Sequence, residues 1–153
     1  MNLPSGLALP PRSSLDYTRM GINDFVNIAI GVPFLDQGRD FFGWDCWGLI
    51  TRAYQECFDI ELPSLDRYSV MSYEQGKELF DSLAVAYQEV PVPLAKVGDV
   101  VVMRGIPCHA GLVVKTGLML HVDEKVDTCV ESYINGIWRK RVIGAYRHAE
   151  LSN

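Results

Sequence analysis

The sequence predicts an α+β fold in which N-terminal helices pack on a mostly antiparallel sheet of five or six strands. Apolar residues recur at helical spacing in the first half of the chain, whereas the part after Pro91 consists of short β-branched runs separated by Gly, Asp and Asn turns. A length of 153 residues with 48% hydrophobic composition suits one packed core. Because the helices precede the strands and do not alternate with them, the pattern favours α+β over a parallel α/β sheet.

The N-terminal stretch, residues 1–20, is predicted to be an extended arm, because its prolines interrupt backbone hydrogen bonding and oppose a helix. Residues 21–150 are then expected to form a single domain. Its first element should be a short helix that is capped by Asn23 and ended by Gly31. The apolar residues of this helix recur at helical spacing: Phe25, Val26, Ala29 and Ile30.

Two further helices and a series of strands are predicted to follow. The second helix runs from Asp45 to about Phe58, and a third, less regular one begins at Ser72 and contains Gly76. The strand-like segments after Pro91 are VGDVVVM, AGLVV, LMLHV, VDTCVES and WRKRVIGAYRH.

Composition and charge exclude several classes of protein. The chain carries 14 Lys and Arg against 19 Asp and Glu, a net charge of −5, and has no extended basic run, so we expect no nucleic-acid partner. The first residues lack a charged region followed by an apolar stretch, and no segment is long enough to span a bilayer. We therefore expect neither a signal peptide nor membrane insertion. Without secretion, the 4 cysteines are expected to be reduced.

The stretch GWDCWG contains the first candidate catalytic residue, Cys46. Asp45 is a good N-cap, which places Cys46 in the first turn of the second helix. There, unpaired N–H groups and the helix dipole favour an anion and lower the pKa of a thiol. The alternative is that Cys46 is a small buried hydrophobic residue, as Cys57 is expected to be in the middle of the same apolar stripe. The position at the open end of the helix favours a nucleophile.

A nucleophilic thiol needs a base, and the sequence offers 3 histidines. His148 lies in a charged segment near the C-terminus and is expected at the surface. His109 opens one predicted strand and His121 lies in the next, so these two residues are the candidates. Each of them alone has the alternative of being an ordinary structural histidine in a strand.

The register of the hairpin between these strands decides whether the two imidazoles share a face. With a three-residue loop at 115–117, Val114 pairs with Leu118, and His121 lies diagonal to His109. Both rings then point to the same side of the sheet. The set resembles a nucleophile, a base and a group that orients the base.

Metal binding is the competing interpretation of these residues. Cys46, Cys108, His109 and His121 could supply four zinc ligands. However, Cys108 and His109 are adjacent in a predicted strand and should point to opposite faces, and the sequence has no Cys-x-x-Cys spacing. We therefore expect no metal, and nothing in the sequence indicates a cofactor.

Four segments in this order resemble the NlpC-type cysteine peptidases, a papain-like family of cell-wall endopeptidases. They are DCWGL at a helix start, VGDVVV, a strand that opens with HAGLVV, and LHV twelve residues after His109. The resemblance runs from about Ile28 to Arg147. The segments PFLDQGRDFFGWDCWGLITRAYQECFDIELP and VIGAYRH are most similar to the subgroup that assembles the tail tip of long-tailed bacteriophages.

The resemblance implies roles for individual residues and a papain-like, NlpC-type fold. It makes Cys46 the nucleophile, His109 the base and His121 the orienting residue. The implied substrate-binding residues are Asp45, Trp47, Phe34 and Trp44. Many family members carry Tyr at the position of Phe34 and Ser at that of Trp47, where they help to hold the amino end of the substrate, so this chain departs from the family there.

The resemblance also implies a function. It predicts a phage tail-associated cysteine peptidase that hydrolyses peptidoglycan stem peptides by thiol acyl transfer, typically at the D-glutamyl-diaminopimelate bond. The partners would be the stem peptide and other tail-tip proteins, and the location would be the host cytoplasm during assembly and then the virion tail tip. The alternatives are a structural tail-tip subunit on a peptidase fold, an amidase or acyltransferase, and an injected wall-degrading toxin.

Overall fold

The computed structural model describes residues 19–63, 85–105 and 109–151. The third predicted helix, which begins at Ser72, and Cys108 lie outside these ranges. So does the predicted arm, apart from its last residues, where the Met20 amide donates to the carbonyl of Glu56 at 3.0 Å.

The first half of the chain forms the helical layer, as predicted. Helix α1 spans Ile22–Ala29, and α2 spans Cys46–Ala53 and continues as a π-helical turn, η1, over Tyr54–Phe58. Between the helices, strands β1 (Arg39–Asp40) and β2 (Gly43–Trp44) form a small antiparallel hairpin. The predicted end of the second helix near residue 58 is therefore confirmed.

The start of α1 differs from the prediction. Gly21 is the N-cap, since its carbonyl accepts from the Phe25 amide at 3.0 Å, and Asn23 lies inside the first turn. The helix forms without a side-chain cap because its buried residues, Phe25 and Ala29, anchor it in the core. The predicted end is confirmed, because Gly31 adopts a left-handed φ of +91° just after the helix.

The second half of the chain forms a six-stranded sheet in which every pair of neighbouring strands is antiparallel. The strand order is β3-β8-β4-β5-β6-β7. The bounds are β3 Tyr87–Val90, β4 Val100–Met103, β5 His109–Lys115, β6 Leu118–Asp123, β7 Val126–Ser132 and β8 Val142–His148. Short 3₁₀ turns occupy Val92–Leu94 (η2) and Ala149–Leu151 (η3). The predicted fold class and sheet are confirmed.

The last predicted strand is shorter than expected. WRKRVIGAYRH suggested one strand from Trp138, but Trp138 belongs to a short helix, α4 (Gly136–Arg139), and β8 begins only at Val142. Asn135 and Gly136 start this helix, and Gly136 has a φ of +70° that suits glycine. Trp138 is thereby carried away from the ladder and packs against the sheet.

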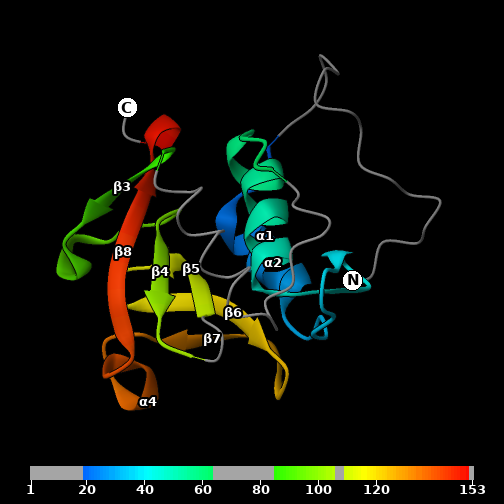
Figure 1. Cartoon of the computed structure of the whole chain (residues 1–153). Coiled ribbons are helices and arrows are strands. Elements are labelled where there is room, and N and C mark those ends of the chain that lie inside the picture. Colours follow the sequence, from blue (N-terminus) through cyan, green and yellow to red (C-terminus); the bar gives the residue numbers. More distant parts are fainter. Residues whose placement is uncertain (1–18, 64–84, 106–108, 152–153) are drawn as a thin grey trace.

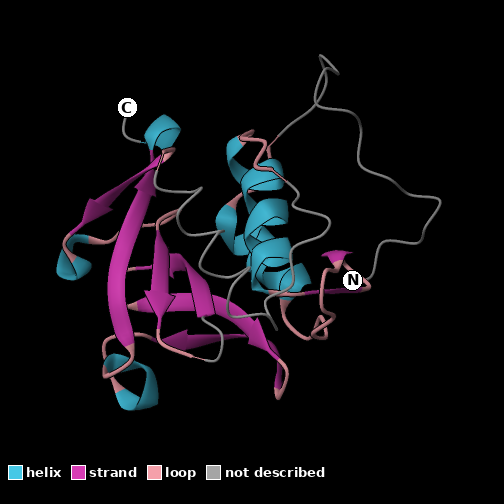
Figure 2. Cartoon of the chain, in the orientation of Figure 1, coloured by secondary structure: helices cyan, strands magenta, loops and turns pink. Residues whose placement is uncertain are grey.

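The sheet separates two layers (Figures 1 and 2). Helices α1 and α2 cover one face, and α2 contacts β5 and β6. Even-numbered residues of β5, such as Ala110 and Leu112, point into this helical core. Odd-numbered residues, such as Val113, point to the other face, where Trp138 of α4 packs. This alternation determines where the two candidate histidines lie.

The register of the β5–β6 hairpin corrects the predicted loop. The turn contains residues 116–117, and Lys115, not Val114, pairs with Leu118. A β-bulge lies between Val113 and Lys115, beyond which Val113 pairs with Met119. The loop length was wrong by one residue, but the bulge adds one residue to β5 and restores the parity of the prediction.

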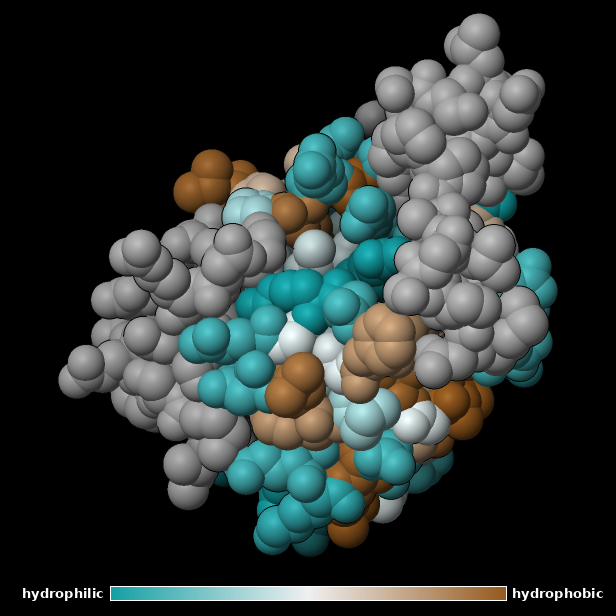
Figure 3. All heavy atoms as spheres, turned by 90° about the vertical axis from the view of Figure 1, so that its right-hand side faces the viewer, coloured by the Kyte–Doolittle hydropathy of each residue, from teal (hydrophilic) through white to brown (hydrophobic). Residues whose placement is uncertain are grey.

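Figure 3 views the molecule from the right-hand side of Figure 1, and hydrophobic residues are interspersed with hydrophilic ones on this face. The exposed large hydrophobic side chains in the segment between α1 and α2 are Ile30, Leu35 and Phe42. Among the described residues, none of the helices has the length and apolarity required to cross a bilayer.

Candidate active site

The start of α2 places Cys46 as its first residue, and Asp45 caps it as predicted. The fully buried Asp45 carboxylate accepts from the amides of Gly48 at 2.8 Å and Gln37 at 2.9 Å and from the Arg39 guanidinium at 2.8 Å. Burial raises the pKa of Asp45, while the Arg39 charge and these hydrogen bonds act in the opposite direction. The contacts hold the helix start in place, and the Cys46 side chain there is 6% exposed.

A close approach of two backbones explains the glycine that follows the thiol. A Cβ at Gly48 would lie 2.0 Å from the carbonyl oxygen of Gly38, which no real side chain tolerates. Only glycine lets the first turn of α2 pack this tightly against the β1–β2 hairpin. The pattern GWDCWG therefore encodes the cap and the packing of the helix that carries the thiol.

The two candidate histidines meet on one face of the sheet, as predicted. His109 Nε2 lies 2.8 Å from His121 Nδ1, and the ring centroids are 5.0 Å apart. His109 begins β5 and is 8% exposed, whereas His121 of β6 is fully buried. The third histidine does not lie at the surface as predicted: His148 is 6% exposed and its ring contacts those of Tyr54 and Tyr87.

Burial favours the neutral form of both paired imidazoles. Burial, followed by the neighbouring His121, lowers the pKa of His109 to about 4; Arg141 acts in the same direction and Asp123 opposes it. Burial also lowers the pKa of His121, against the hydrogen bond and charge of Glu131. A neutral imidazole carries one N–H donor and one acceptor nitrogen, so each ring can pass a hydrogen bond from one side to the other.

A carboxylate that the sequence analysis missed completes this chain of hydrogen bonds. Glu131 Oε2 lies 2.5 Å from His121 Nε2 and accepts from the indole Nε1 of Trp138 at 2.9 Å. Trp138 also stacks on His109 with a centroid distance of 5.1 Å and an interplanar angle of 25°. Glu131 pairs with Met119 across β6–β7 and so shares a face with His121, but this register depends on a bulge in β7 that the local sequence does not reveal.

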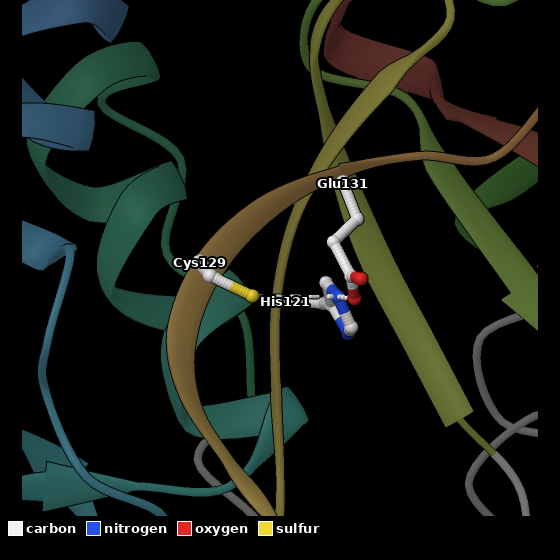
Figure 4. A group of neighbouring side chains, drawn as sticks. All are labelled: His121, Cys129 and Glu131. Atoms are coloured by element: carbon white, nitrogen blue, oxygen red, sulfur yellow. Dashed lines mark hydrogen bonds and ion pairs between the residues drawn. The ribbon is translucent and has the colours of Figure 1, made fainter.

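Figure 4 shows His121 of β6 together with Cys129 and Glu131 of β7. In the described part of the chain, these three residues form the group that could offer ligand atoms to a metal, and the set differs from the one considered above. Two ligands of a tetrahedral zinc lie roughly 3.4 Å apart. His121 Nε2 lies 2.5 Å from Glu131 Oε2 and 3.8 Å from Cys129 Sγ. The spacing is that of a hydrogen bond between His121 and Glu131, which is how we interpret the group.

The residues expected to bind substrate are mostly packed into the protein. Trp44 is fully buried, and its Nε1 donates to Thr128 Oγ1 at 2.8 Å. Trp47 is 2% exposed and donates to the carbonyl of Pro63 at 2.9 Å. Phe34 is partly buried against the helical core. These contacts explain the aromatic residues as packing, and a role of Phe34, Trp44, Asp45 or Trp47 toward a substrate stays a prediction.

The proximity of Cys46 to His109 also stays a prediction. Cys46 belongs to the same buried cluster as Ala110 and Val122, each of which directly follows one of the histidines. The imidazoles lie on the other face of the sheet, at the start of β5 and within β6. Cys57 matches its predicted place in the core, at 8% exposure. Both cysteines are thiols in the structure, as is Cys129.

Comparison with known proteins gives a family match. A sequence model described as the NlpC/P60 family matches residues 31–147. No curated protein sequence matches the chain.

Several solved structures are similar, and three of them serve as examples. The NlpC/p60 domain of the peptidoglycan hydrolase SagA has a TM-score of 0.57 at 19% identity over 82% of this chain and 94% of that one. A protein from Staphylococcus aureus subsp. aureus Mu50, described as similar to a lipoprotein of the NLP/P60 family, has a TM-score of 0.61 at 19% identity. The match covers 89% of this chain and 45% of that one. An NlpC/P60 family protein from Bacillus cereus ATCC 10987 has a TM-score of 0.60 at 18% identity, over 86% of this chain and 41% of that one. The chain spans less than half the length of these last two proteins.

Proposed function

Because the chain belongs to the NlpC/P60 family, we propose that it is a cysteine peptidase that hydrolyses peptide bonds in peptidoglycan. Cys46 is the nucleophile, His109 the base and His121 the residue that orients the base. The observation that carries the proposal is the hydrogen bond of 2.8 Å between His109 Nε2 and His121 Nδ1, in a domain where a capped cysteine begins the helix packed on the same strands. Because this bond engages Nε2 of His109, the proposal assigns the other ring nitrogen, Nδ1, to the thiol.

The reaction begins with proton transfer. His109 Nδ1 takes the proton of the Cys46 thiol, and the thiolate attacks the carbonyl carbon of the substrate peptide. The carbonyl oxygen becomes an oxyanion, which backbone N–H groups at the start of α2 stabilise, including that of Cys46. The positive end of the helix dipole supports both the thiolate and the oxyanion.

The second half of the reaction returns the enzyme to its first state. His109 gives its proton to the leaving amine, the C–N bond breaks and a thioester with Cys46 remains. A water molecule then attacks the thioester while His109 accepts its proton. The proton passes to the Cys46 sulfur as the C–S bond breaks, which releases the carboxylic acid product.

The finer parts of the proposal concern the bond and the biological setting. The sequence resemblance supports cleavage at the D-glutamyl-diaminopimelate bond and a role in the tail tip of a bacteriophage, with other tail-tip proteins as partners. The protein would then be made in the host cytoplasm and incorporated into the virion. Mass spectrometry of purified virions from a producing host would detect the chain in tails if this setting is right.

Digestion of purified peptidoglycan tests the activity. Wild type should release fragments whose masses identify the bond cleaved, and Cys46→Ala and His109→Ala should release none. Cys57→Ala is the matched control, because Cys57 is buried on the helical side and takes no part in the reaction. A wild-type protein without hydrolysis, or a Cys46→Ala variant that hydrolyses normally, would contradict the proposal.

A structural tail-tip subunit is the second candidate, and the low exposure of the thiol favours it. Cys46 and His109 are only 6% and 8% exposed, so a substrate needs an opening at the end of the two elements. Of the aromatic residues in the segment 34–47, Phe42 is the exposed one at 61%. A thiol that resists alkylation in the folded protein would favour this candidate over the peptidase.

A further inference from the structure

A carboxylate lies beyond the two histidines, and the proposed mechanism does not yet use it. Glu131 Oε2 contacts both His121 Nε2 and Trp138 Nε1. We propose that Glu131 is a positioning residue that fixes the tautomers of His121 and His109 and thereby keeps His109 Nδ1 as the proton acceptor. The inference rests on the proposed function for its catalytic meaning, but the tautomers themselves can be measured without a substrate.

The tautomers follow from the identity of each donor and acceptor. An ionised carboxylate only accepts, so His121 Nε2 must carry the proton that it donates to Glu131. Neutral His121 then has an unprotonated Nδ1, which can only accept from His109 Nε2 across their 2.8 Å contact. Neutral His109 is therefore protonated at Nε2, and its Nδ1 holds a lone pair. Glu131 thus determines the state of a nitrogen two rings away.

Without Glu131, the hydrogen bond between His121 and His109 could run in either direction. His121 could then carry its proton on Nδ1 and donate to His109 Nε2, which would force the proton of His109 onto Nδ1. In this reversed arrangement His109 presents an N–H to the thiol and cannot take its proton. Both arrangements contain a hydrogen bond between the two rings. A group that accepts from His121 Nε2 is therefore what makes the first arrangement more stable than the second.

Trp138 holds the carboxylate and both rings in this arrangement. Its Nε1 donates to the same Glu131 oxygen at 2.9 Å, and its ring stacks on His109 and contacts His121 edge to face at an interplanar angle of 80°. The Arg141 guanidinium lies 5.5 Å from the centroid of the Trp138 ring. The indole cannot accept a hydrogen bond, so it leaves the tautomer choice to Glu131 and restricts only the geometry.

The charges around the rings agree with this role. His121 faces Glu131 and Cys129 on β7. The charge of Asp123 raises the pKa of both histidines, whereas that of Arg141 lowers the pKa of His109. Burial and Glu131 raise the pKa of the Cys129 thiol, which keeps it neutral and a weak competitor for His121 Nε2. When His109 accepts the thiol proton, Glu131 is the carboxylate hydrogen-bonded to the pair of rings, and it stabilises the positive charge that develops.

Two substrate-free measurements on four variants test the inference. Glu131→Ala removes the acceptor, Glu131→Gln keeps a carbonyl that can accept from His121, and Trp138→Phe keeps the stacked ring without the donor. Glu124→Gln is the matched control, because Glu124 is an exposed residue of the β6–β7 turn whose substitution removes the same charge. Iodoacetamide alkylation of Cys46 is followed by peptide mass mapping across pH, and ¹⁵N-histidine NMR reports which ring nitrogens are protonated.

We expect Glu131→Ala to slow Cys46 alkylation at pH 7 by roughly tenfold to a hundredfold. This is less than the ~10⁴-fold loss of kcat that a wrong histidine tautomer causes in a Ser-His-Asp triad. NMR of this variant should show protonation at His109 Nδ1. Glu131→Gln should recover part of the rate, Trp138→Phe should keep the wild-type tautomers, and Glu124→Gln should match wild type.

Alkylation in Glu131→Ala at the wild-type rate across pH, with unchanged ring protonation, would overturn the inference. Equal losses in Glu131→Gln and Glu131→Ala would also overturn it, because they would show that the acceptor itself is unimportant. If wild type fails to cleave peptidoglycan while the tautomers shift as expected, the positioning role stands and only the proposed function fails.

Discussion

Acid should destabilise the folded domain through His109, because its buried imidazole resists protonation. Burial and the neighbouring His121 lower the pKa of His109 from 6.5 to about 4. As the pH falls through this window, the unfolded chain binds a proton that the folded chain does not yet bind. The free energy of unfolding therefore falls as the pH drops below about 6.5 and levels off, for this group, below about 4.

The size of this effect follows from the two pKa values. One pKa unit corresponds to about 1.4 kcal/mol, so the gap between 6.5 and about 4 corresponds to roughly 3 kcal/mol when the group is protonated in both states. His109 is only 8% exposed, so solvent screens little of this effect. Between pH 7.5 and pH 4.5 the loss is about 2–3 kcal/mol. A domain with a total stability of about 5–15 kcal/mol would lose a large part of it.

Urea denaturation of wild type and His109→Gln at pH 7.5 and pH 4.5 measures the effect. Glutamine does not titrate, so the variant should lose about 2 kcal/mol less than wild type between the two pH values, whatever its stability at pH 7.5. Glu124→Gln is the control for a change at an exposed site and should follow wild type. The reasoning is refuted if His109→Gln loses as much stability on acidification as wild type does.

Asp45→Ala should lower the free energy of unfolding by about 2–4 kcal/mol, since it removes the N-cap of α2 and leaves the Arg39 guanidinium without its buried carboxylate. Urea denaturation at pH 7.5 measures this loss. A loss below about 1 kcal/mol would show that water replaces these contacts. Treatment with EDTA should leave both the melting temperature and peptidoglycan hydrolysis unchanged, because His121 and Glu131 are spaced for a hydrogen bond. A loss of activity on chelation that added zinc restores would instead identify the His121, Cys129 and Glu131 group as a metal site.

The start of α2 could be predicted because its determinants are local. Asp45 precedes an apolar stripe, and its carboxylate meets the Gly48 amide three residues later, within reach of a single turn. The capping of α1 could not be predicted in the same way. Packing of Phe25 and Ala29 against the rest of the core selects its position, and that contact is not visible in the local sequence.

The surroundings of the histidines depend on contacts that are far apart in the sequence. Trp138 looked like a strand residue because WRKRVIGAYRH alternates, yet Gly136 allows a turn that starts α4 and brings the indole over His109. The hydrogen bond from Trp138 to Glu131 then follows from the position of α4 next to β7. No local sequence pattern predicts such a contact, because it depends on how a short helix folds back on the sheet.

Both hairpins that build the candidate site combine a short turn with an extra strand residue. Residues 116–117 and 124–125 form the two turns, and a two-residue turn alone would place His121 opposite residue 112 on β5 and residue 128 on β7. His109 and Glu131 would then point away from His121, since neighbouring side chains alternate between faces.

A bulge in each hairpin reverses this outcome. One extra residue on β5 lies between Val113 and Lys115, and the pairs His121 with Cys129 and Asp123 with Val126 require one extra residue on β7. Each bulge shifts the register by one position, which carries His109, His121 and Glu131 to the same face. The hydrogen-bonded chain therefore depends on two irregularities of the backbone as much as on the identity of its side chains, which is why parity predicted the histidine pair although the predicted loop was wrong.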